Sequence, residues 1–170
     1  MFYKSLSMVA RHFRISEIGR HKVNRHYTVA NCMEPKVYAK YLSAIKGESI
    51  KKEDFIPAET DKKFTVTAKN YKIKGGLSER LNEADIGTVY EVQGPMGKGL
   101  DIQPDGTHIA FSAGTGCLVF VDLVAHLVRK NLGLLGADEE AQVGDKFKLV
   151  MFMSFPKKED AIAYDLCAGL

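Results

Sequence analysis

Three side chains in the segment Arg25-His26-Tyr27-Thr28 could together bind a flat, phosphorylated ligand. Arg25 keeps its positive charge and can grip a phosphate through two parallel hydrogen bonds. Tyr27 offers a rigid face for a planar heterocycle, and the Thr28 hydroxyl can donate or accept a hydrogen bond. The alternation of side chains over 23–29 predicts the end of a β-strand. An ordinary surface strand with a half-buried Tyr would show the same residues.

A second segment, Gly75-Gly76-Leu77-Ser78, suits a pyrophosphate. Two glycines let the backbone approach a ligand closely, and the start of a helix directs free N–H groups and partial positive charge towards an anion. Ser78 can cap that helix or donate a hydrogen bond to phosphate. A plain glycine turn with a serine cap is the alternative. Together with Arg25, the segment predicts a site for two phosphates rather than one.

A third segment, Ala113-Gly114-Thr115-Gly116, lies between an apolar run over 109–111 and a helical pattern from Leu118 to Asn131. A glycine-rich turn in that setting receives the pyrophosphate of a dinucleotide. The apolar run from Phe147 to Phe152 follows, and this strand–helix–strand order predicts a β-α-β unit with a parallel sheet.

These segments and Gly94-Pro95-Met96-Gly97 occur in the order found in the ferredoxin–NADP reductase superfamily. Over roughly residues 11–165 the chain resembles that superfamily, and it looks most like the FAD and NAD(P)H modules of the NADH–cytochrome b5 reductase and nitrate reductase branch. The resemblance implies an oxidoreductase that moves electrons from NADH or NADPH through FAD to a one-electron acceptor.

The resemblance also implies a role for each segment. Tyr27 would lie against the isoalloxazine ring and Thr28 would reach flavin N5, the atom that receives hydride, so these two are the expected catalytic residues. Lys69 and Tyr71 stand where the branch has a Lys-x-Tyr pair beside the cofactors, although they could equally be a sheet-surface pair. The implied cofactor-binding residues are Arg25, Tyr27, Thr28, Lys69, Tyr71, Gly75, Gly76, Leu77 and Ser78 for FAD, and Gly114, Thr115 and Gly116 for the nicotinamide nucleotide.

The implied fold is a small antiparallel FAD-binding β-barrel over 1–104, followed by an incomplete doubly wound, parallel α/β lobe over 105–170. The pattern from Pro35 to Gly47 predicts a helix within an insertion over 34–58. We expect its apolar stripe to pack against the barrel, with docking of a partner as the alternative. The other expected elements are strands within 8–31, Phe64–Tyr71 and Thr88–Gln93, a short helix Ser78–Asn82 and a helix beginning in Lys157–Leu166.

The chain departs from the family pattern in three respects. Ala113 replaces the first glycine of the usual turn, and Val119 stands where the family usually has Pro. Alanine is tolerable there if its φ angle is negative. Relative to the pattern the chain also looks cut at both ends, and the loop that positions the nicotinamide is expected beyond Leu170. We therefore expect FAD binding with slow or no reduction by NADH.

Composition narrows the functional classes. The 170 residues are 45% hydrophobic and 26% charged, which is ordinary for a soluble globular protein, and no apolar run approaches the roughly 18 residues of a membrane span. A formal net charge of +3 gives no indication of nucleic-acid binding. The histidines show no metal-ligand spacing. Three scattered cysteines favour free thiols in a reducing, cytoplasmic compartment, while the basic, acid-free stretch over 1–14 is also compatible with a mitochondrial transit peptide.

The sequence thus favours an NAD(P)H-dependent flavoprotein reductase. Its acceptor would be a haem or iron–sulfur protein, either separate or part of the same full-length polypeptide. An FAD-binding or interaction module without hydride transfer is the alternative, and a structural barrel without a cofactor is a third possibility.

Overall fold

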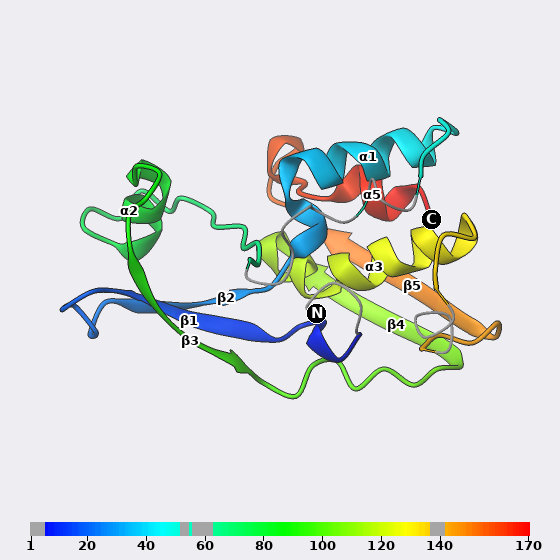
Figure 1. Ribbon diagram of the computed structural model, residues 1–170, viewed down its shortest axis with the longest axis horizontal. Helices are drawn as coiled ribbons and strands as arrows, with labels where there is room; N and C mark the ends of the chain where they lie inside the picture. Colours follow the sequence, from blue (N-terminus) through cyan, green and yellow to red (C-terminus); the bar gives the residue numbers. More distant parts are fainter. Residues whose placement is uncertain (1–5, 52–54, 56–62, 137–141) are drawn as a thin grey trace.

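A computed structural model describes residues 6–51, 55, 63–136 and 142–170. The protein has a mixed α/β fold with one antiparallel and one parallel sheet (Figure 1). The strands are β1 (His12–Glu17), β2 (Asn24–Thr28), β3 (Tyr90–Met96), β4 (Gly106–Ala113) and β5 (Phe147–Ser154). The α-helices are α1 (Pro35–Ile45), α2 (Leu77–Glu83), α3 (Leu118–Asn131) and α5 (Tyr164–Ala168), and the 3-10 turns are η1 (Leu6–Met8), η2 (Asn31–Met33), η5 (Gly114–Cys117) and η6 (Lys158–Asp160). None of the described helices combines the length and hydrophobicity needed to cross a membrane.

The antiparallel sheet has the order β2-β1-β3. Phe13 and Ile15 on β1 are buried while Arg14 between them is exposed, as the alternating pattern predicts. Phe13 stacks on Phe64 with ring centroids 4.2 Å apart, and Leu77 of α2 belongs to the same buried cluster. This core therefore attaches both α2 and the segment around Phe64 to one face of the sheet.

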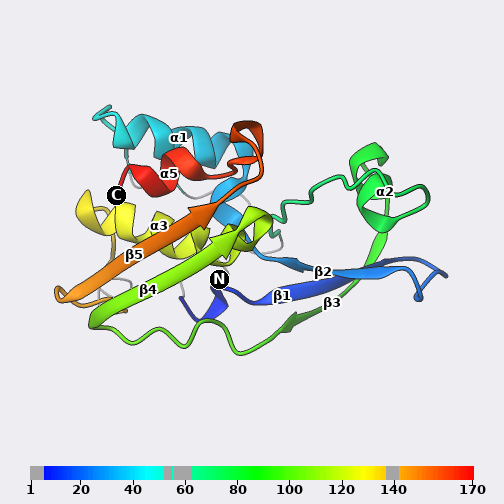
Figure 2. The same cartoon turned by 180° about the vertical axis from the view of Figure 1, so that it is seen from behind.

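The unit β4-α3-β5 forms the parallel sheet, which confirms the predicted β-α-β unit. Helix α3 also has the predicted bounds, Leu118–Asn131. It packs on one face of the sheet, while no described helix covers the opposite face in Figure 2. That outer face carries four exposed apolar side chains, Ile109, Phe111, Val150 and Phe152.

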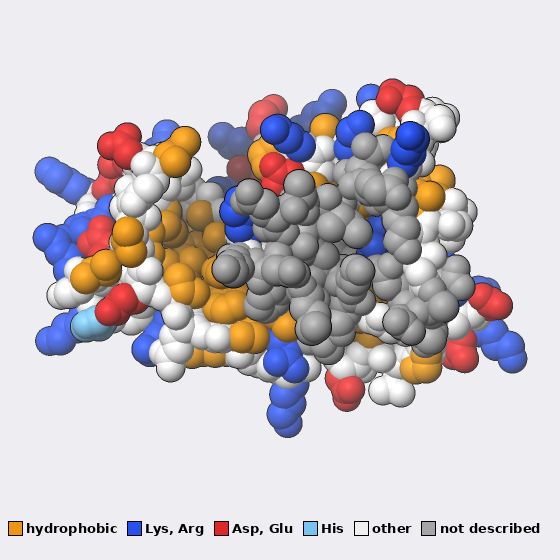
Figure 3. Space-filling view, in the orientation of Figure 1, with side chains coloured by type: hydrophobic (Ala, Val, Ile, Leu, Met, Phe, Trp, Pro, Cys, Tyr) orange, Lys and Arg blue, Asp and Glu red, His pale blue; other side chains and the backbone are white. Residues whose placement is uncertain are grey.

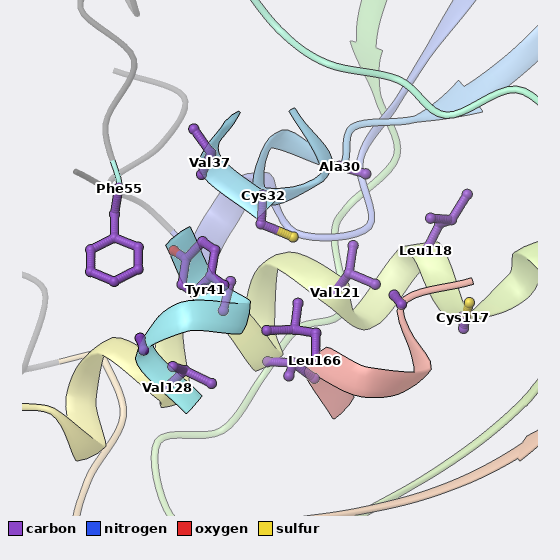
Figure 4. Close-up of a cluster of buried hydrophobic side chains, with 14 residues drawn as sticks. Ala30, Cys32, Val37, Tyr41, Phe55, Cys117, Leu118, Val121, Val128 and Leu166 are labelled. Atoms are coloured by element: carbon purple, nitrogen blue, oxygen red, sulfur yellow. The ribbon is translucent and has the colours of Figure 1, made fainter. Parts of the chain in front are cut away.

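Helices α1, α3 and α5 enclose the largest buried cluster (Figure 4). The predicted helix after Glu34 is confirmed as α1, and the Glu34 carboxylate accepts the Val37 N–H at 2.8 Å. Tyr41 is only 4% exposed and packs against Phe55 with ring centroids 4.6 Å apart. The helix packs as predicted, but on a different surface: it contacts η2, α3 and α5. The remainder of the predicted insertion, at 52–54 and 56–58, lies outside the described residues.

The chain leaves the antiparallel sheet before α1 begins. After β2 ends at Thr28, two backbone N–H groups of η2 donate to the Asp122 carboxylate of α3, so α1 starts beside α3 rather than over the sheet. The same departure corrects a second prediction. Phe64–Tyr71 is not a regular strand, because β2 turns away and the described residues keep only the single bridge between Val29 and Val66. Strand β3 starts two residues later than predicted and continues through Gly94-Pro95. The predicted helix over Lys157–Leu166 is divided between the 3-10 turn η6 and helix α5.

Candidate functional site

A cavity of about 470 Å³ lies between β2, the segment 67–73, α2 and the start of α3. Hydrophobic side chains gather in the recess beside α2 in Figure 3. The lining of the cavity combines an apolar surface, formed mainly by aromatic and aliphatic side chains, with hydroxyls and cations. The lining residues are Arg25, His26, Tyr27, Thr28, Thr67, Lys69, Tyr71, Ile73, Gly76, Leu77, Ser78, Thr115 and Leu118.

Nine of the twelve residues predicted to bind a cofactor line this one cavity. They come from four separate segments of the chain. The other three, Gly75, Gly114 and Gly116, do not line it, although each is next in sequence to a residue that does. The sequence prediction missed His26, Thr67, Ile73 and Leu118. Two of these, Thr67 and Ile73, could have been found from the sequence. They continue, in both directions, the every-second-residue spacing of the predicted pair Lys69 and Tyr71.

Strand β2 contributes a cation, an aromatic ring and a hydroxyl. The exposed Arg25 donates one hydrogen bond from Nη1 to the Asn24 carbonyl at 2.9 Å. A guanidinium has five N–H donors, so the others remain for a ligand. Tyr27 is half-buried, and burial raises the pKa of its phenol above the ordinary value, against an opposing effect of the Arg25 charge. The ring of Tyr27 therefore presents a neutral face next to a permanent cation.

The Gly75-Gly76 turn brings backbone close to the cavity. Gly75 has a φ of +74°, which favours glycine, and a Cβ on Gly76 would lie 2.9 Å from the Ile73 carbonyl oxygen. The Gly75 N–H donates to the Glu79 carboxylate at 2.7 Å, so this turn already binds an anionic group of its own chain. Of the two roles considered for Ser78, capping the helix is not the one that the structure shows. Gly76 is the N-cap residue, and Ser78 is buried in the first turn of α2, where it lines the cavity.

An ion pair fixes α2 on the sheet. The Arg80 guanidinium donates a hydrogen bond to the Glu17 carboxylate at the end of β1. This hydrogen bond and the charge of Arg80 lower the pKa of Glu17, although partial burial opposes them. Because α2 carries Leu77 and Ser78, the Arg80–Glu17 pair holds one wall of the cavity in place.

A second cavity, of about 290 Å³, lies beside the first. The two share Thr67, Lys69 and Thr115, and the second adds Gly114 and the carboxylates Glu159 and Asp160. The ammonium of Lys69 lies 3.1 Å from Asp160, so the one cation among the lining residues of this cavity is already paired.

The backbone of the glycine-rich turn beside this cavity accommodates alanine at position 113. Ala113, in place of the usual glycine, has a φ of −128°, an extended conformation that alanine adopts without strain. The turn itself forms η5 and continues directly into α3. Cys117 at its end is fully buried and belongs to the main core.

A scan against protein-family models and searches of curated proteins and of solved structures gave no match to this chain. The two cavities and the residues that line them are therefore the basis for a functional proposal.

Proposed function

We propose that this chain is an FAD-dependent NAD(P)H oxidoreductase module of the ferredoxin–NADP reductase type, which passes electrons to a one-electron acceptor such as a haem or iron–sulfur protein. In this proposal the first 104 residues form a small antiparallel barrel, and 105–170 form part of a doubly wound lobe. One observation carries the proposal: eight of the nine residues chosen from sequence as flavin ligands converge, from three segments, on a single cavity.

The cavity fits the chemistry of FAD. Its volume of about 470 Å³ lies within the roughly 300–1,000 Å³ usual for ligand sites. Arg25 retains N–H donors for one phosphate, and Ser78 with the first-turn N–H groups of α2, which have no partner within the helix, can serve the other. The Glu79 carboxylate at Gly75 supports this view, since it shows that the turn accepts an anion. Bound phosphate would compete with Glu79 for that N–H group.

Tyr27, Tyr71 and Leu77 supply faces for a flat ring system within the same cavity. Thr28 lies one residue beyond Tyr27 on β2 and can offer its hydroxyl to the ring edge, which is the role proposed for it at flavin N5. The flavin, when bound, supplies the hydride and single-electron chemistry, and the protein orients it and excludes water. Tyr27 and Thr28 are therefore the proposed catalytic residues.

The second cavity is proposed to hold the nicotinamide nucleotide. It adjoins the first across Thr67, Lys69 and Thr115, so a ligand there could reach the flavin ring. The carboxylates of Glu159 and Asp160 can accept hydrogen bonds from ribose hydroxyls and would repel a 2′-phosphate. We therefore propose NADH rather than NADPH as the donor.

One observation favours the alternative of an FAD-binding module without hydride transfer. The second cavity has two carboxylates and a single cation, and that cation, Lys69, is paired with Asp160. A pyrophosphate there would rely on the backbone of Gly114 and Thr115 alone.

Anaerobic absorbance spectra distinguish the possibilities. Protein incubated with FAD and freed of unbound flavin is mixed with NADH, with NADPH, or with dithionite as a positive control. The proposal predicts a yellow protein that NADH bleaches slowly, yet faster than NADPH does. A yellow protein that only dithionite bleaches would support the alternative, and a colourless protein would contradict both.

A further inference from the structure

Three segments that line the larger cavity meet at one pair of side chains, Asn31 and Asp122. The Asp122 carboxylate on α3 accepts the N–H of Asn31 at 3.0 Å on one oxygen and the N–H of Cys32 at 2.9 Å on the other. Asn31, which is 2% exposed, uses its side-chain oxygen to accept the Thr65 N–H at 3.0 Å. The connection therefore runs from α3 through η2 to the segment at Thr65.

Each end of this connection lies a few residues from the cavity. Thr28 precedes Asn31 by three positions, Thr67 follows Thr65 by two, and Leu118 lies one helical turn before Asp122. The segment over 65–71 depends on this connection more than a regular strand would. To the rest of the described chain its backbone makes only one β-bridge, at Val66, and no hydrogen-bonded ladder.

A carboxylate is the side chain that meets the needs of this junction. Two backbone N–H groups point at Asp122, and an ionised carboxylate offers an acceptor to each, whereas an amide offers only one. Burial raises the pKa of Asp122, and the hydrogen bonds from the Cys32 and Asn31 backbones oppose that rise.

We infer that Asp122 is a positioning residue of the cofactor site: through Asn31 it fixes the end of β2, the segment 65–71 and the start of α3 relative to one another. Neither Asp122 nor Asn31 lines the cavity. Asp122 thus acts by setting the spacing of Thr28, Thr67 and Thr115 around the ligand. As a statement about FAD affinity, the inference rests on the proposed function.

Asp122→Asn tests the inference, with Val124→Ala as its control. The substitution keeps the side-chain shape but sets an amide NH₂ against one of the two N–H groups. Val124 is on the same helix and fully buried, so its truncation destabilises α3 while it keeps every hydrogen-bonding group of the junction. Amide ¹H–¹⁵N spectra of the flavin-free proteins and FAD titrations are compared between the two variants, at temperatures that give both the same margin below their unfolding midpoints.

For Asp122→Asn we expect FAD to bind about tenfold more weakly or worse, because displacement of contacts by about 1 Å is costly. We expect its amide resonances at Thr28, Thr67 and Thr115 to shift more than in Val124→Ala. Equal FAD affinity in the two variants would overturn the inference. If the parent protein binds no FAD, the proposed function fails, and the amide spectra alone then decide whether Asp122 positions the three segments.

Asn31→Ala provides a second variant should Asp122→Asn fail to fold. It removes the acceptor for Thr65 and leaves both backbone hydrogen bonds to Asp122 in place. The expected result is a shift of the Thr67 resonance with little change at Thr115. An unchanged Thr67 resonance would contradict the proposed connection.

Discussion

The ammonium of Lys69 and the carboxylate of Asp160 lie 3.1 Å apart in the lining of the second cavity, although 91 positions separate them in sequence. The pair joins the segment between α1 and α2 to η6, which follows β5. It brings a carboxylate to the place where the proposed nucleotide would present its ribose. In the proposed function, the charge at Asp160 would therefore separate the two nicotinamide cofactors.

Asp160→Asn is predicted to reduce the preference for NADH over NADPH. Two unit charges 4 Å apart in water interact by about 1 kcal/mol, so loss of this repulsion should change the ratio of the two apparent affinities by roughly fivefold. The measurement is flavin bleaching at varied NADH and NADPH concentrations. The exposed Asp165 on α5, which lines neither cavity, provides the control Asp165→Asn. An unchanged ratio in Asp160→Asn would exclude the proposed ribose contact.

Arg25→Ala is predicted to weaken FAD binding while the protein remains folded. A hydrogen bond to a charged group is worth about 1.5–3 kcal/mol, which corresponds to an increase in Kd of roughly tenfold or more. Arg14→Ala is the matched control, since Arg14 is also an exposed Arg in the antiparallel sheet but does not line the cavity. Flavin content after purification, compared at equal circular dichroism, measures the effect. Equal flavin content in Arg25→Ala and Arg14→Ala would refute a phosphate contact by Arg25.

Tyr41→Ala is predicted to lower the free energy of unfolding by about 3 kcal/mol, as truncation of a large buried side chain does. Tyr41 is 4% exposed and contacts Phe55, so removal of its ring leaves a cavity in the main core. Tyr164, which is 52% exposed on α5, gives the control Tyr164→Ala, with a loss on the order of 1 kcal/mol or less. Urea unfolding measures both, and similar losses in the two variants would mean that α1 contributes little to the core.

Acid is predicted to release α2 from the sheet through Glu17. Its pKa in the folded protein is lowered from 4.5 by the Arg80 hydrogen bond and charge, so the ion pair stabilises the fold above that pH. This stabilisation is lost as the pH falls through the lowered pKa. Glu17→Gln should therefore show a shallower loss of stability below about pH 4.5. The exposed Glu83→Gln on α2 serves as the control, and identical acid profiles for the two variants would argue against the role of the pair.

Local patterns in the sequence predicted local structure well. Helix α3 was predictable because its apolar residues recur at helical spacing and Gly133 follows its end. The alternation around Arg25, Tyr27 and Thr28 indicated the strand that places all three on the cavity. What failed was pairing over long distances. Alternation over Phe64–Tyr71 predicted a strand, but the partner strand turns away at Asn31.

The remaining features of the site depend on contacts that sequence spacing does not reveal. Lys69 and Asp160 meet only because η6 folds back beside the segment after Val66. Asp122 is a single acid in an apolar helix, and such a residue usually faces solvent. Its two backbone donors come from residues about 90 positions earlier. These pairings follow from the tertiary arrangement and could not be predicted from local patterns.

Titration of the flavin-free protein with FAD and with FMN, followed by flavin fluorescence, tests the central claim most directly. The proposal predicts saturable binding of one FAD per chain and weaker binding of FMN, because the turn at Gly75-Gly76 and Arg25 would each contact a phosphate of FAD. It also predicts that Arg25→Ala reduces the difference between the two flavins. Absence of saturable FAD binding, or equal affinity for FAD and FMN in the parent protein, would contradict a dinucleotide site in this cavity.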